Sequence, residues 1–355
     1  MQPMRLFYLP NEGREGDQVG PRQAFEHELA HGRLSAYQAY SYQVERTRHP
    51  DQASALRALL SSMAAFAPDL IFWQHIDDGY ALNAAFLAEL KALPGRPWLV
   101  YHEADAYGRY VKRMDRTLRS MFAACDLAVV VGLGDLARLV RECGAPRVLY
   151  SPNSVDDIRF GQPWTPTLQR RFDAVMIANL TCLMRVPWLY MPGGAKRKNL
   201  AALCHAALGD RFAVFGAGQG WAGQPYGHGP VPYAAQEATL RQSWLSLNWG
   251  QFDTLPMYAS DRLVISLASG VPHITNHQPG YDELYAGARA LFTVHSPAEA
   301  LDVVDWLLSQ PREHLIEMGQ QTAQFARQHF SARRVYGDLL VAISQHMQCP
   351  GARSA

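Results

Sequence analysis

The chain of 355 residues is about twice the usual length of one domain, so we expect two domains of similar size. A hydrophobic share of 48% against a charged share of 18% predicts two well-formed cores and excludes a long disordered tail. Lys and Arg number 33 and Asp and Glu number 32, so the net charge of +1 gives no electrostatic footprint for nucleic acid or another polyanion.

The cysteines and the N-terminal segment indicate the compartment. The five cysteines are odd in number, far apart and without a C-x-x-C pair, which argues against a disulfide framework and against a zinc site. The first residues lack the apolar core and cleavage site of a signal peptide, and no run of about 18 apolar residues could span a membrane. We therefore expect a cytoplasmic protein with no transmembrane segment.

Residues 4 to about 160 alternate short apolar runs with amphipathic stretches. The runs are continuous and rich in Val, Ile, Leu and aromatic residues, as in parallel strands covered on both faces. Asp51 and Asp115 precede two of the stretches and mark helix starts. The pattern predicts a doubly wound sheet, with strands at 4–9, 35–41, 69–75, 98–102, 127–131 and 147–151 and helices at 22–31, 51–67, 81–92, 116–124 and 135–142.

A second α/β series follows a segment at 160–166 that proline and polar residues mark as a linker. The stretch 311–347 is helical in pattern, with Ser331 as a helix cap. We divide the chain into domains at 1–161 and 162–330 with a C-terminal helix at 331–355. The second series has strands expected at 172–177, 212–215, 245–248, 273–276 and 290–294 and helices at 199–208, 234–242, 261–269, 281–285 and 297–308.

Ligands of open parallel sheets bind beyond the carboxyl ends of the strands, so the loops there are the candidate site. The loop at 10–20, which carries Glu12 and Glu15, is either a ligand loop or an ordinary flexible loop. The segment 74–78, QHIDD, follows the third strand and contains Asp77.

The segment 101–108, YHEADAYG, directly follows the fourth strand. A histidine and two acids at one strand end can serve as a base and the group that orients it, so His102, Glu103 and Asp105 are the catalytic candidates. The alternative is a capped helix start without a chemical role.

The segment GGAKRKN at 193–199 places a glycine pair and three cations at the entrance to a helix. Backbone N–H groups, the helix dipole and basic side chains together suit a diphosphate. The alternative is a solvated basic loop. The glycines of VFGAGQG at 214–220 run into WAGQPYGHGP, which cannot form a helix, so we interpret them as a loop at a strand end and not as a dinucleotide fingerprint.

Residues 247–285 read LNWGQFDTLPMYASDRLVISLASGVPHITNHQPGYDELY. They combine a strand ending in Leu-Asn, an arginine opening a helix that ends in Ala-small-Gly, another strand, and Pro-Gly-x-x-Glu-Leu. This stretch resembles the C-terminal signature of GT-B glycosyltransferases, and is most similar to the spore-maturation-protein (CgeB-type) enzymes and their family-four relatives. RVLYSPNSVD at 147–156 resembles the strand that closes the family's N-terminal domain, and KRKN resembles its phosphate site.

The resemblance implies an α/β GT-B fold, in which two Rossmann-like doubly wound domains face each other across a cleft. The first domain would take the acceptor, the second would bind the nucleotide-sugar, and the final helix would cross back to the first domain. The implied reaction moves a sugar from a UDP- or dTDP-linked donor to a saccharide, lipid-linked or protein acceptor. It needs no cofactor beyond the nucleotide-sugar and no metal.

Residue by residue, the resemblance assigns the donor diphosphate to Lys198 and Arg197, with Arg262 facing the nucleotide or phosphate. His102 would contact the donor sugar near the reacting carbon. The donor-binding set is Gly194, Arg197, Lys198, Asn248, Arg262, Gly280, Tyr281 and Glu283, where Gly280 and Tyr281 would present backbone N–H groups. Glu12, Glu15 and Asp77 are the candidates on the acceptor side.

Two departures from the family pattern matter. Ile265 stands where the family usually has the glutamate that grips the ribose diol, so a deoxyribose donor such as a dTDP-sugar is tolerated or preferred in our hypothesis. The insert at 180–194 is either an acceptor pocket, a partner surface or a locally packed excursion. Three other functions stay open: a solute-binding protein, a nucleotide-sugar epimerase, and an inactive GT-B scaffold or sugar-binding protein.

Overall fold

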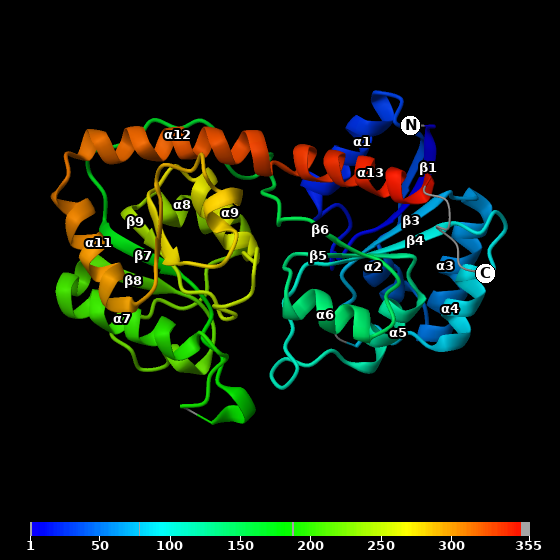
Figure 1. Ribbon diagram of the computed structural model, residues 1–355, viewed down its shortest axis with the longest axis horizontal. Helices are drawn as coiled ribbons and strands as arrows, with labels where there is room; N and C mark the ends of the chain where they lie inside the picture. The colour runs from blue at the N-terminus through cyan, green and yellow to red at the C-terminus, as the bar shows by residue number, and fades with distance from the viewer. Residues whose placement is uncertain (1, 78, 187, 349–355) are drawn as a thin grey trace. The chain divides into compact units, whose positions relative to one another are not determined.

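The computed structural model of the chain describes residues 2–77, 79–186 and 188–348. Two compact units divide between Pro152 and Asn153 and again between Ser331 and Ala332. Unit 1 contains the N-terminal part of the chain and its last helix, and unit 2 contains the residues between them (Figure 1).

Six parallel strands form the sheet of unit 1, in the order β2-β1-β3-β4-β5-β6. The strands β1, β3, β4 and β5 are almost wholly buried, as the continuous apolar runs predict. The six strands are β1 (Met4–Leu9), β2 (Leu34–Ala39), β3 (Leu70–Gln74), β4 (Trp98–Glu103), β5 (Leu127–Val130) and β6 (Val148–Tyr150).

Helices cover both faces of this sheet. Phe72 of β3 packs against Phe25 and Tyr336 on one face, and Tyr101 of β4 packs against Phe122 on the other. The helices are α1 (Val19–Ala30), α2 (Tyr42–Arg48), α3 (Gln52–Phe66), α4 (Ala84–Lys91), α5 (Arg116–Ala124), α6 (Asp135–Glu142) and α13 (Ala332–Gln348). Tyr336 belongs to α13, so the last helix of the chain completes the core of unit 1.

Unit 2 contains five parallel strands in the order β11-β10-β9-β7-β8. They are β7 (Phe172–Ile177), β8 (Phe212–Phe215), β9 (Ser243–Leu247), β10 (His273–Asn276) and β11 (Leu291–Val294). The helices are α7 (Gly194–Leu208), α8 (Gln236–Leu240), α9 (Asp261–Ala268), α10 (Tyr281–Leu284), α11 (Pro297–Ser309) and α12 (Arg312–Phe330), with 3-10 turns at Leu183–Arg185, Gly209–Arg211, Gln219–Trp221 and Tyr233–Ala235.

Successive side chains of β7 point to opposite faces of this sheet. Met176 packs in a core with Leu200 of α7 and residues of α11, and Val175 packs in a second core with Val264 of α9 and residues of α12. Both units are therefore parallel sheets with helices on both faces, as predicted.

The secondary structure expected from sequence is confirmed for each predicted strand and helix, with shifts of a few residues at the ends. The caps are confirmed as well, because Asp51 accepts a hydrogen bond from Ser54 N–H and Asp115 accepts one from Leu118 N–H. The short helix α2 was not predicted. The glycines at 214–220 form a loop and a 3-10 turn, as expected, and open no α-helix.

Residues 160–166, which the sequence predicted as a linker, differ from expectation, because they lie inside unit 2 and pack onto it rather than linking two domains. Phe160 is fully buried and its ring lies 5.1 Å from that of Tyr233. The ring of Trp164 lies under the guanidinium groups of Arg170 and Arg241. Proline and polar residues suggested a linker, but the aromatic side chains among them supply apolar surface that is stabilised by burial.

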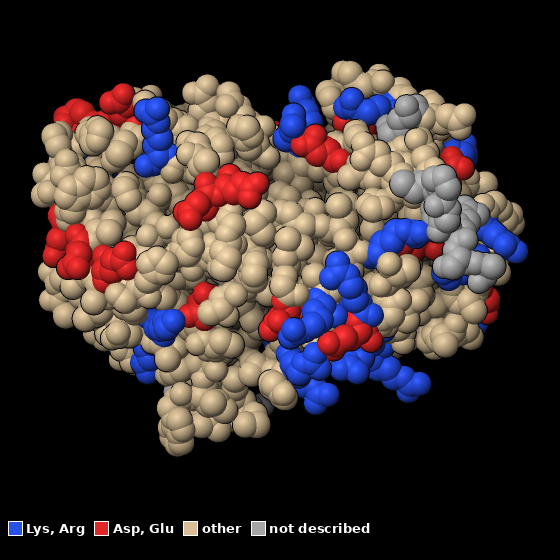
Figure 2. All heavy atoms as spheres, viewed as in Figure 1, with Lys and Arg blue, Asp and Glu red and all other residues tan. Residues whose placement is uncertain are grey.

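Several charged side chains form ion pairs on the surface. Figure 2 shows Lys and Arg gathered with acidic residues over the part of unit 1 that holds α5 and α6. Arg109 forms an ion pair with Glu142 at 2.8 Å, and Lys112 forms one with Asp105 at 2.5 Å. None of the described helices has the length and hydropathy that a membrane span requires.

Candidate functional site

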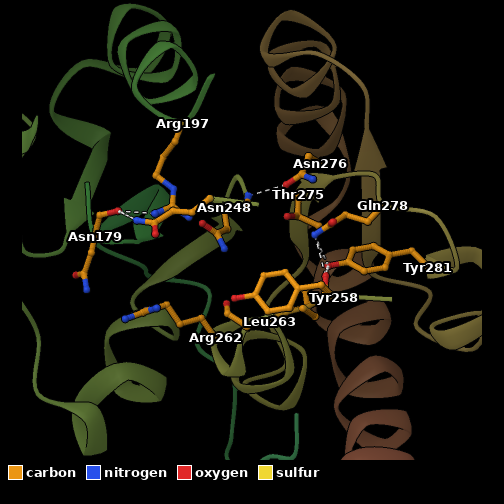
Figure 3. Close-up of a pocket in the computed structure, with 14 residues that line it drawn as sticks. Asn179, Arg197, Asn248, Tyr258, Arg262, Leu263, Thr275, Asn276, Gln278 and Tyr281 are labelled. Atoms are coloured by element: carbon orange, nitrogen blue, oxygen red, sulfur yellow. Dashed lines mark hydrogen bonds between the residues drawn. The ribbon is translucent and has the colours of Figure 1, made fainter. Parts of the chain in front are cut away.

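A polar pocket lies at the carboxyl ends of β7, β9 and β10 in unit 2 (Figure 3). Parallel strands end at one edge of the sheet, so the residues that follow them meet there. The pocket is lined by Asn179, Arg197, Asn248, Gly250, Gln251, Tyr258, Ala259, Ser260, Arg262, Leu263, Thr275, Asn276, Gln278 and Tyr281. Four of these residues belong to the donor-binding set predicted from the sequence, namely Arg197, Asn248, Arg262 and Tyr281.

Arg197 reaches the pocket from the first turn of α7 (Figure 3). Its Nε donates a 2.7 Å hydrogen bond to the Trp249 carbonyl, and Nη1 donates to the Asn179 carbonyl. Burial, together with the neighbouring charge of Arg262, lowers the pKa of Arg197 to about 9. A neighbouring like charge disfavours the charged form of an arginine, and an anion close to both groups would favour it.

Three polar atoms at the pocket are buried without a hydrogen-bond partner: Asn248 Oδ1, Arg262 Nε and Gln278 Oε1. An unsatisfied buried polar atom costs free energy, and a native structure retains several of them at one place for a reason. None of the described residues that line the pocket is an Asp or Glu. The pocket thus offers positive charge and open hydrogen-bonding groups to an anionic ligand that also carries donors.

Hydrogen bonds hold the loop after β9 in place around this pocket. Tyr281 Oη and Gln278 Nε2 both donate to the Tyr258 carbonyl, at 2.7 and 2.8 Å. Asn276 Oδ1 accepts from the Gly250 N–H at 2.6 Å (Figure 3). This wall of the pocket is therefore a fixed frame, which lowers the entropic cost of ligand binding.

The glycine pair at the start of α7 does not offer its N–H groups to a ligand. Gly193 N–H donates to the Gln251 carbonyl and Gly194 N–H to the Met191 carbonyl, both at 2.8 Å. A Cβ atom on Gly193 would overlap the Gly250 carbonyl oxygen. A Cβ atom on Gly194 would overlap the side chain of Tyr190, and Gly194 does not line the polar pocket. Close packing thus accounts for both glycines, and the donor-binding role of Gly194 stays a prediction.

The basic residues of α7 point in three directions, because successive helical residues are about 100° apart. Lys196 forms an ion pair with Asp253 at 3.0 Å, and Lys198 Nζ donates to Tyr190 Oη at 3.0 Å. Lys198 lines a separate, more open hollow together with Trp188, Tyr190, Ala195, Asn199 and Ala202. Only Arg197 among the three cations lines the polar pocket.

Part of the insert at 180–194 lines the same hollow, through Trp188 and Tyr190. Leu180, Cys182 and Met191 are buried, whereas Met184 and Trp188 are 83% and 78% exposed. The insert is thus packed at its base and exposed at its tip, and its role stays a prediction.

The end of the family-like stretch lies only partly at the pocket. Tyr281 N–H donates to the Gln278 carbonyl at 3.1 Å, so this N–H is not available to a sugar or phosphate. Gly280 has a φ of +92°, and a side chain there would collide with Met257. Glu283 is exposed on α10 and does not line the pocket.

The acceptor-side candidates of unit 1 differ in their hydrogen bonds and ion pairs. Glu12 is buried and accepts hydrogen bonds from the Gly16 and Gln18 N–H groups, from Ser41 and from Arg22. Glu15 is exposed in an ion pair with Arg48.

Asp77 is exposed beyond the end of β3, and its N–H donates to Tyr42 Oη at 3.4 Å. Asp78 lies outside the described residues. Glu12 thus holds the loop after β1 with carboxylate oxygens that already accept hydrogen bonds, whereas the carboxylate of Asp77 is exposed.

The three catalytic candidates do not form one group. His102 points to the face of the sheet that carries α13, where its ring packs against Phe72 and Tyr336 and both ring nitrogens are buried without a partner. Burial, together with the charge of His75, lowers the pKa of His102 to about 4, so the ring is neutral near pH 7. Asp105 forms its ion pair with Lys112 at the surface.

Glu103 lies on the opposite face and is paired with His75, which belongs to the predicted loop segment at 74–78 but was not among the catalytic candidates. His75 Nδ1 lies 2.6 Å from Glu103 Oε1. In the parallel pairing of β3 with β4, Gln74 lies opposite His102, so the residues that follow them, His75 and Glu103, lie side by side. Such a register between strands cannot be derived from the sequence. Asn179, Tyr258 and Gln278 were missed in unit 2 for the same reason, since each lies in a loop whose path depends on tertiary contacts.

Comparisons with known proteins agree with this architecture. A family model described as glycosyl transferase-like matches residues 196–340, which include the pocket residues from Arg197 to Tyr281. The structure is similar to that of Alr3699/HepE from Anabaena in complex with UDP and glucose, with a TM-score of 0.59 at 12% identity over 96% of this chain and 99% of that chain.

Two further solved structures are similar along almost the whole chain. The DNA-modifying enzyme β-glucosyltransferase, crystallised in the presence and absence of the substrate uridine diphosphoglucose, has a TM-score of 0.59 at 12% identity, covering 96% of this chain and 100% of that chain. T4 phage BGT in complex with UDP and Mn²⁺ has a TM-score of 0.57 at 12% identity, covering 95% and 99%. No curated protein sequence matches this chain.

The chain therefore has the GT-B fold, with two Rossmann-like units of parallel sheet and helices, as the sequence predicted.

Proposed function

We propose that the protein is a glycosyltransferase that moves a sugar from a nucleoside diphosphate donor to a hydroxyl group of an acceptor. The observation that carries the proposal is the pocket of unit 2, where Arg197 and Arg262 lie without a carboxylate among the described lining residues. A diphosphate supplies the missing negative charge, and a nucleoside and a sugar supply donors for Asn248 Oδ1 and Gln278 Oε1.

The chemistry of sugar transfer fits this arrangement. As the bond between the anomeric carbon and the diphosphate oxygen breaks, negative charge grows on the leaving group. Fixed positive charges and hydrogen-bond donors aimed at that charge lower the barrier. The two arginines supply this stabilisation by themselves, so we propose a reaction without a divalent metal. T4 phage BGT has been crystallised with UDP and Mn²⁺, so transfer should be measured both with and without this metal.

The donor is UDP- or dTDP-linked in this proposal. HepE structures contain UDP and UDP-glucose, which supports a uracil or thymine nucleotide. Ile265 is fully buried in the apolar core beneath α9, so no carboxylate at this position bonds the ribose diol. The 2′-hydroxyl then contributes little, and dTDP is accepted as well as UDP.

The finer assignments belong to the same proposal. The acceptor is a saccharide, lipid-linked or protein hydroxyl, and the subfamily is the CgeB type that the stretch at 247–285 resembles. A cytoplasmic site of action is supported by the absence of disulfides among the described cysteines.

A binding experiment tests the donor site. Thermal unfolding is followed with UDP, dTDP, GDP, ADP and CDP, because a ligand of the folded state raises the apparent stability by about 2.7 kcal/mol at a hundredfold excess over its Kd. UDP and dTDP are expected to stabilise the wild type. Asn248→Leu, which removes an unpaired buried oxygen, should weaken UDP about tenfold, while the matched Asn199→Leu outside the pocket should not.

A transfer experiment tests the reaction itself. UDP-glucose is incubated with soluble glucosides and the products are analysed for released UDP and for new glycosides, with and without Mn²⁺ and with EDTA. Release of UDP together with a new glycoside supports the proposal. Conversion of the donor sugar without UDP release would show an epimerase, and UDP binding without any conversion of several donors would show an inactive binding protein.

A further inference from the structure

A cluster of cations lies on the surface of unit 1, on α5 and on the loop that joins β4 to α5. Residues 109–119 hold five Lys or Arg and a single acid, in a chain whose net charge is only +1. All five cations are exposed, and they lie in the region where Figure 2 shows basic side chains gathered. We call this cluster the basic surface of unit 1, and it consists of Arg109, Lys112, Arg113, Arg116 and Arg119.

The helix α5 presents two of these cations to solvent. Leu118 and Phe122 are buried on one side of the helix. Arg116 and Arg119 lie three residues apart on the other side, so their side chains are neighbours. The acid within the cluster is Asp115, whose carboxylate accepts the Leu118 N–H at 2.7 Å as the helix cap. The single acid of residues 109–119 is therefore used by the backbone of α5.

The loop before α5 is held by a turn and by an ion pair. The Gly108 N–H donates to the Val111 carbonyl at 3.1 Å, which closes the turn. Arg109 joins the loop to α6 through its ion pair with Glu142 at 2.8 Å. Tyr110 lies in this turn, and its side chain is 87% exposed. The loop thus presents an aromatic ring to solvent next to a cation.

Three arginines of the basic surface have no acidic partner. Arg113, Arg116 and Arg119 form no ion pair with any residue in the described part of the chain, whereas Lys112 is paired with Asp105. Cations placed close together without acids repel each other, which lowers the stability of the folded chain. The net charge of +1 conceals this local excess, because acids elsewhere in the chain balance it. The excess charge is therefore available to an anionic partner.

Exposed cations of this kind suit an extended anionic surface. A single anion is bound by buried donors held in a fixed frame, as in the pocket of unit 2. Exposed Lys and Arg side chains instead act through their summed charge, and each one increases the affinity for an anionic bilayer about fivefold. An exposed tyrosine adds to this attraction, because its ring is apolar and its hydroxyl is polar, which suits the level of the lipid headgroups.

We propose that the basic surface of unit 1 docks the protein onto a membrane surface that contains anionic phospholipids, with Tyr110 at the level of the headgroups. The inference does not rest on the proposed function. The lipid phosphates supply the negative charge that Arg113, Arg116 and Arg119 lack inside the protein. Docking of this kind is peripheral and reversible, and it requires no membrane-spanning helix.

A vesicle-binding experiment tests the docking. The full chain is sedimented with vesicles of phosphatidylcholine alone and with vesicles that also contain about 30 mol% phosphatidylglycerol, at about 0.15 M and about 0.5 M salt. The wild type should bind only the anionic vesicles, and the higher salt should weaken binding. The triple variant Arg113→Gln, Arg116→Gln and Arg119→Gln should bind about a hundredfold more weakly, since three fivefold losses multiply. Tyr110→Ser should bind about three- to tenfold more weakly.

The matched control removes the same amount of charge from another part of unit 1. It carries Arg14→Gln, Arg57→Gln and Arg333→Gln, which replace three exposed arginines. The control should bind anionic vesicles within about threefold of the wild type, because exposed charges beyond a Debye length are screened. Each of these variants should keep the unfolding temperature and the thermal shift with UDP, so that a loss of binding reports on the surface alone.

Each outcome bears on the proposal and leaves the proposed function intact. No binding of the wild type to anionic vesicles, wild-type binding by the triple variant, or an equal loss in the control would overturn it. Tighter binding of a short DNA duplex than of anionic vesicles at the same salt, lost in the triple variant, would assign the surface to nucleic acid and overturn the lipid proposal. Unchanged binding of Tyr110→Ser would overturn the placement of this ring at the headgroups.

Discussion

The strand ends of the two units carry opposite electrostatic designs. In unit 2, Arg197 and Arg262 line a pocket without a carboxylate among its described residues, and three polar atoms there lack partners. In unit 1, Glu12 and Glu103 are buried, and each is matched by several donors. The difference indicates which site binds an anionic ligand. The pocket of unit 2 lacks the negative charge that a diphosphate brings, whereas the buried carboxylates of unit 1 are satisfied by donors of the same unit.

The largest effect is expected from the glycine that lets α7 approach the loop after β9. Gly193→Ala places a Cβ against the Gly250 carbonyl and should cost about 3 kcal/mol and abolish the response to UDP, because the pocket wall must shift. Gly13→Ala in the first loop of unit 1 is the matched control, since the nearest atom would be 4.0 Å from the new Cβ. Urea unfolding with and without UDP measures both effects. An unaffected Gly193→Ala would break the description of the pocket.

The carboxylates of unit 1 provide the second comparison. Glu12→Gln should lower the free energy of unfolding by about 2 kcal/mol, because it weakens the bonds with Arg22 and the loop N–H groups. The affinity for UDP should not change. Glu15→Gln, which removes an exposed ion pair with Arg48, should cost less than about 0.5 kcal/mol. Altered UDP affinity in Glu12→Gln would show that this loop serves the ligand after all.

Two of the histidines of unit 1, His102 and His75, should respond to pH with opposite sign. The pKa of His102 is lowered to about 4, so its contribution is complete above pH 6.5 and is lost as the pH falls toward 4. Burial lowers the pKa of His75, but the charge and hydrogen bond of Glu103 outweigh burial and raise it to about 9, so the contribution of His75 is complete below pH 6.5 and is lost as the pH rises through 9. Relative to His102→Phe, the wild type should lose about 2 kcal/mol of stability between pH 8 and pH 5. A constant difference between the two proteins would contradict a buried neutral His102.

The smallest effect concerns the nucleotide. Because Ile265 is buried in the core, the affinities for UDP and dTDP should differ by less than about threefold, that is by less than about 0.7 kcal/mol. Isothermal titration of the wild type with both nucleotides measures the difference. Clearly tighter binding of UDP would show that another residue recognises the ribose diol.

The sequence predicted the two sheets well because each strand of a parallel sheet is a local apolar run with a local helix after it. The helix caps at Asp51 and Asp115 are local as well. The prediction of a linker at 160–166 was wrong, since the attachment of this segment to unit 2 depends on the tertiary contacts of Phe160 and Trp164.

The site was predicted only in outline for the same physical reason. Sequence placed a basic helix start and an arginine at the pocket, but which of Arg197 and Lys198 faces inward depends on where α7 begins. The pairing of His75 with Glu103 depends on a register between strands that lie 28 residues apart. Local patterns define the elements, and contacts between distant segments define which side chains meet.

The most direct test of the central claim compares two cations of unit 2. Both were predicted from the sequence to bind the donor, but they occupy different places in the structure. Arg262 lines the polar pocket, whereas Lys198 is bonded to Tyr190 outside it. UDP is titrated calorimetrically into the wild type, Arg262→Gln and Lys198→Gln. A charged hydrogen bond is worth about 1.5–3 kcal/mol, so we expect Arg262→Gln to weaken UDP by roughly 10- to 100-fold and Lys198→Gln by less than threefold. Loss of binding in Lys198→Gln with normal binding in Arg262→Gln would contradict the account.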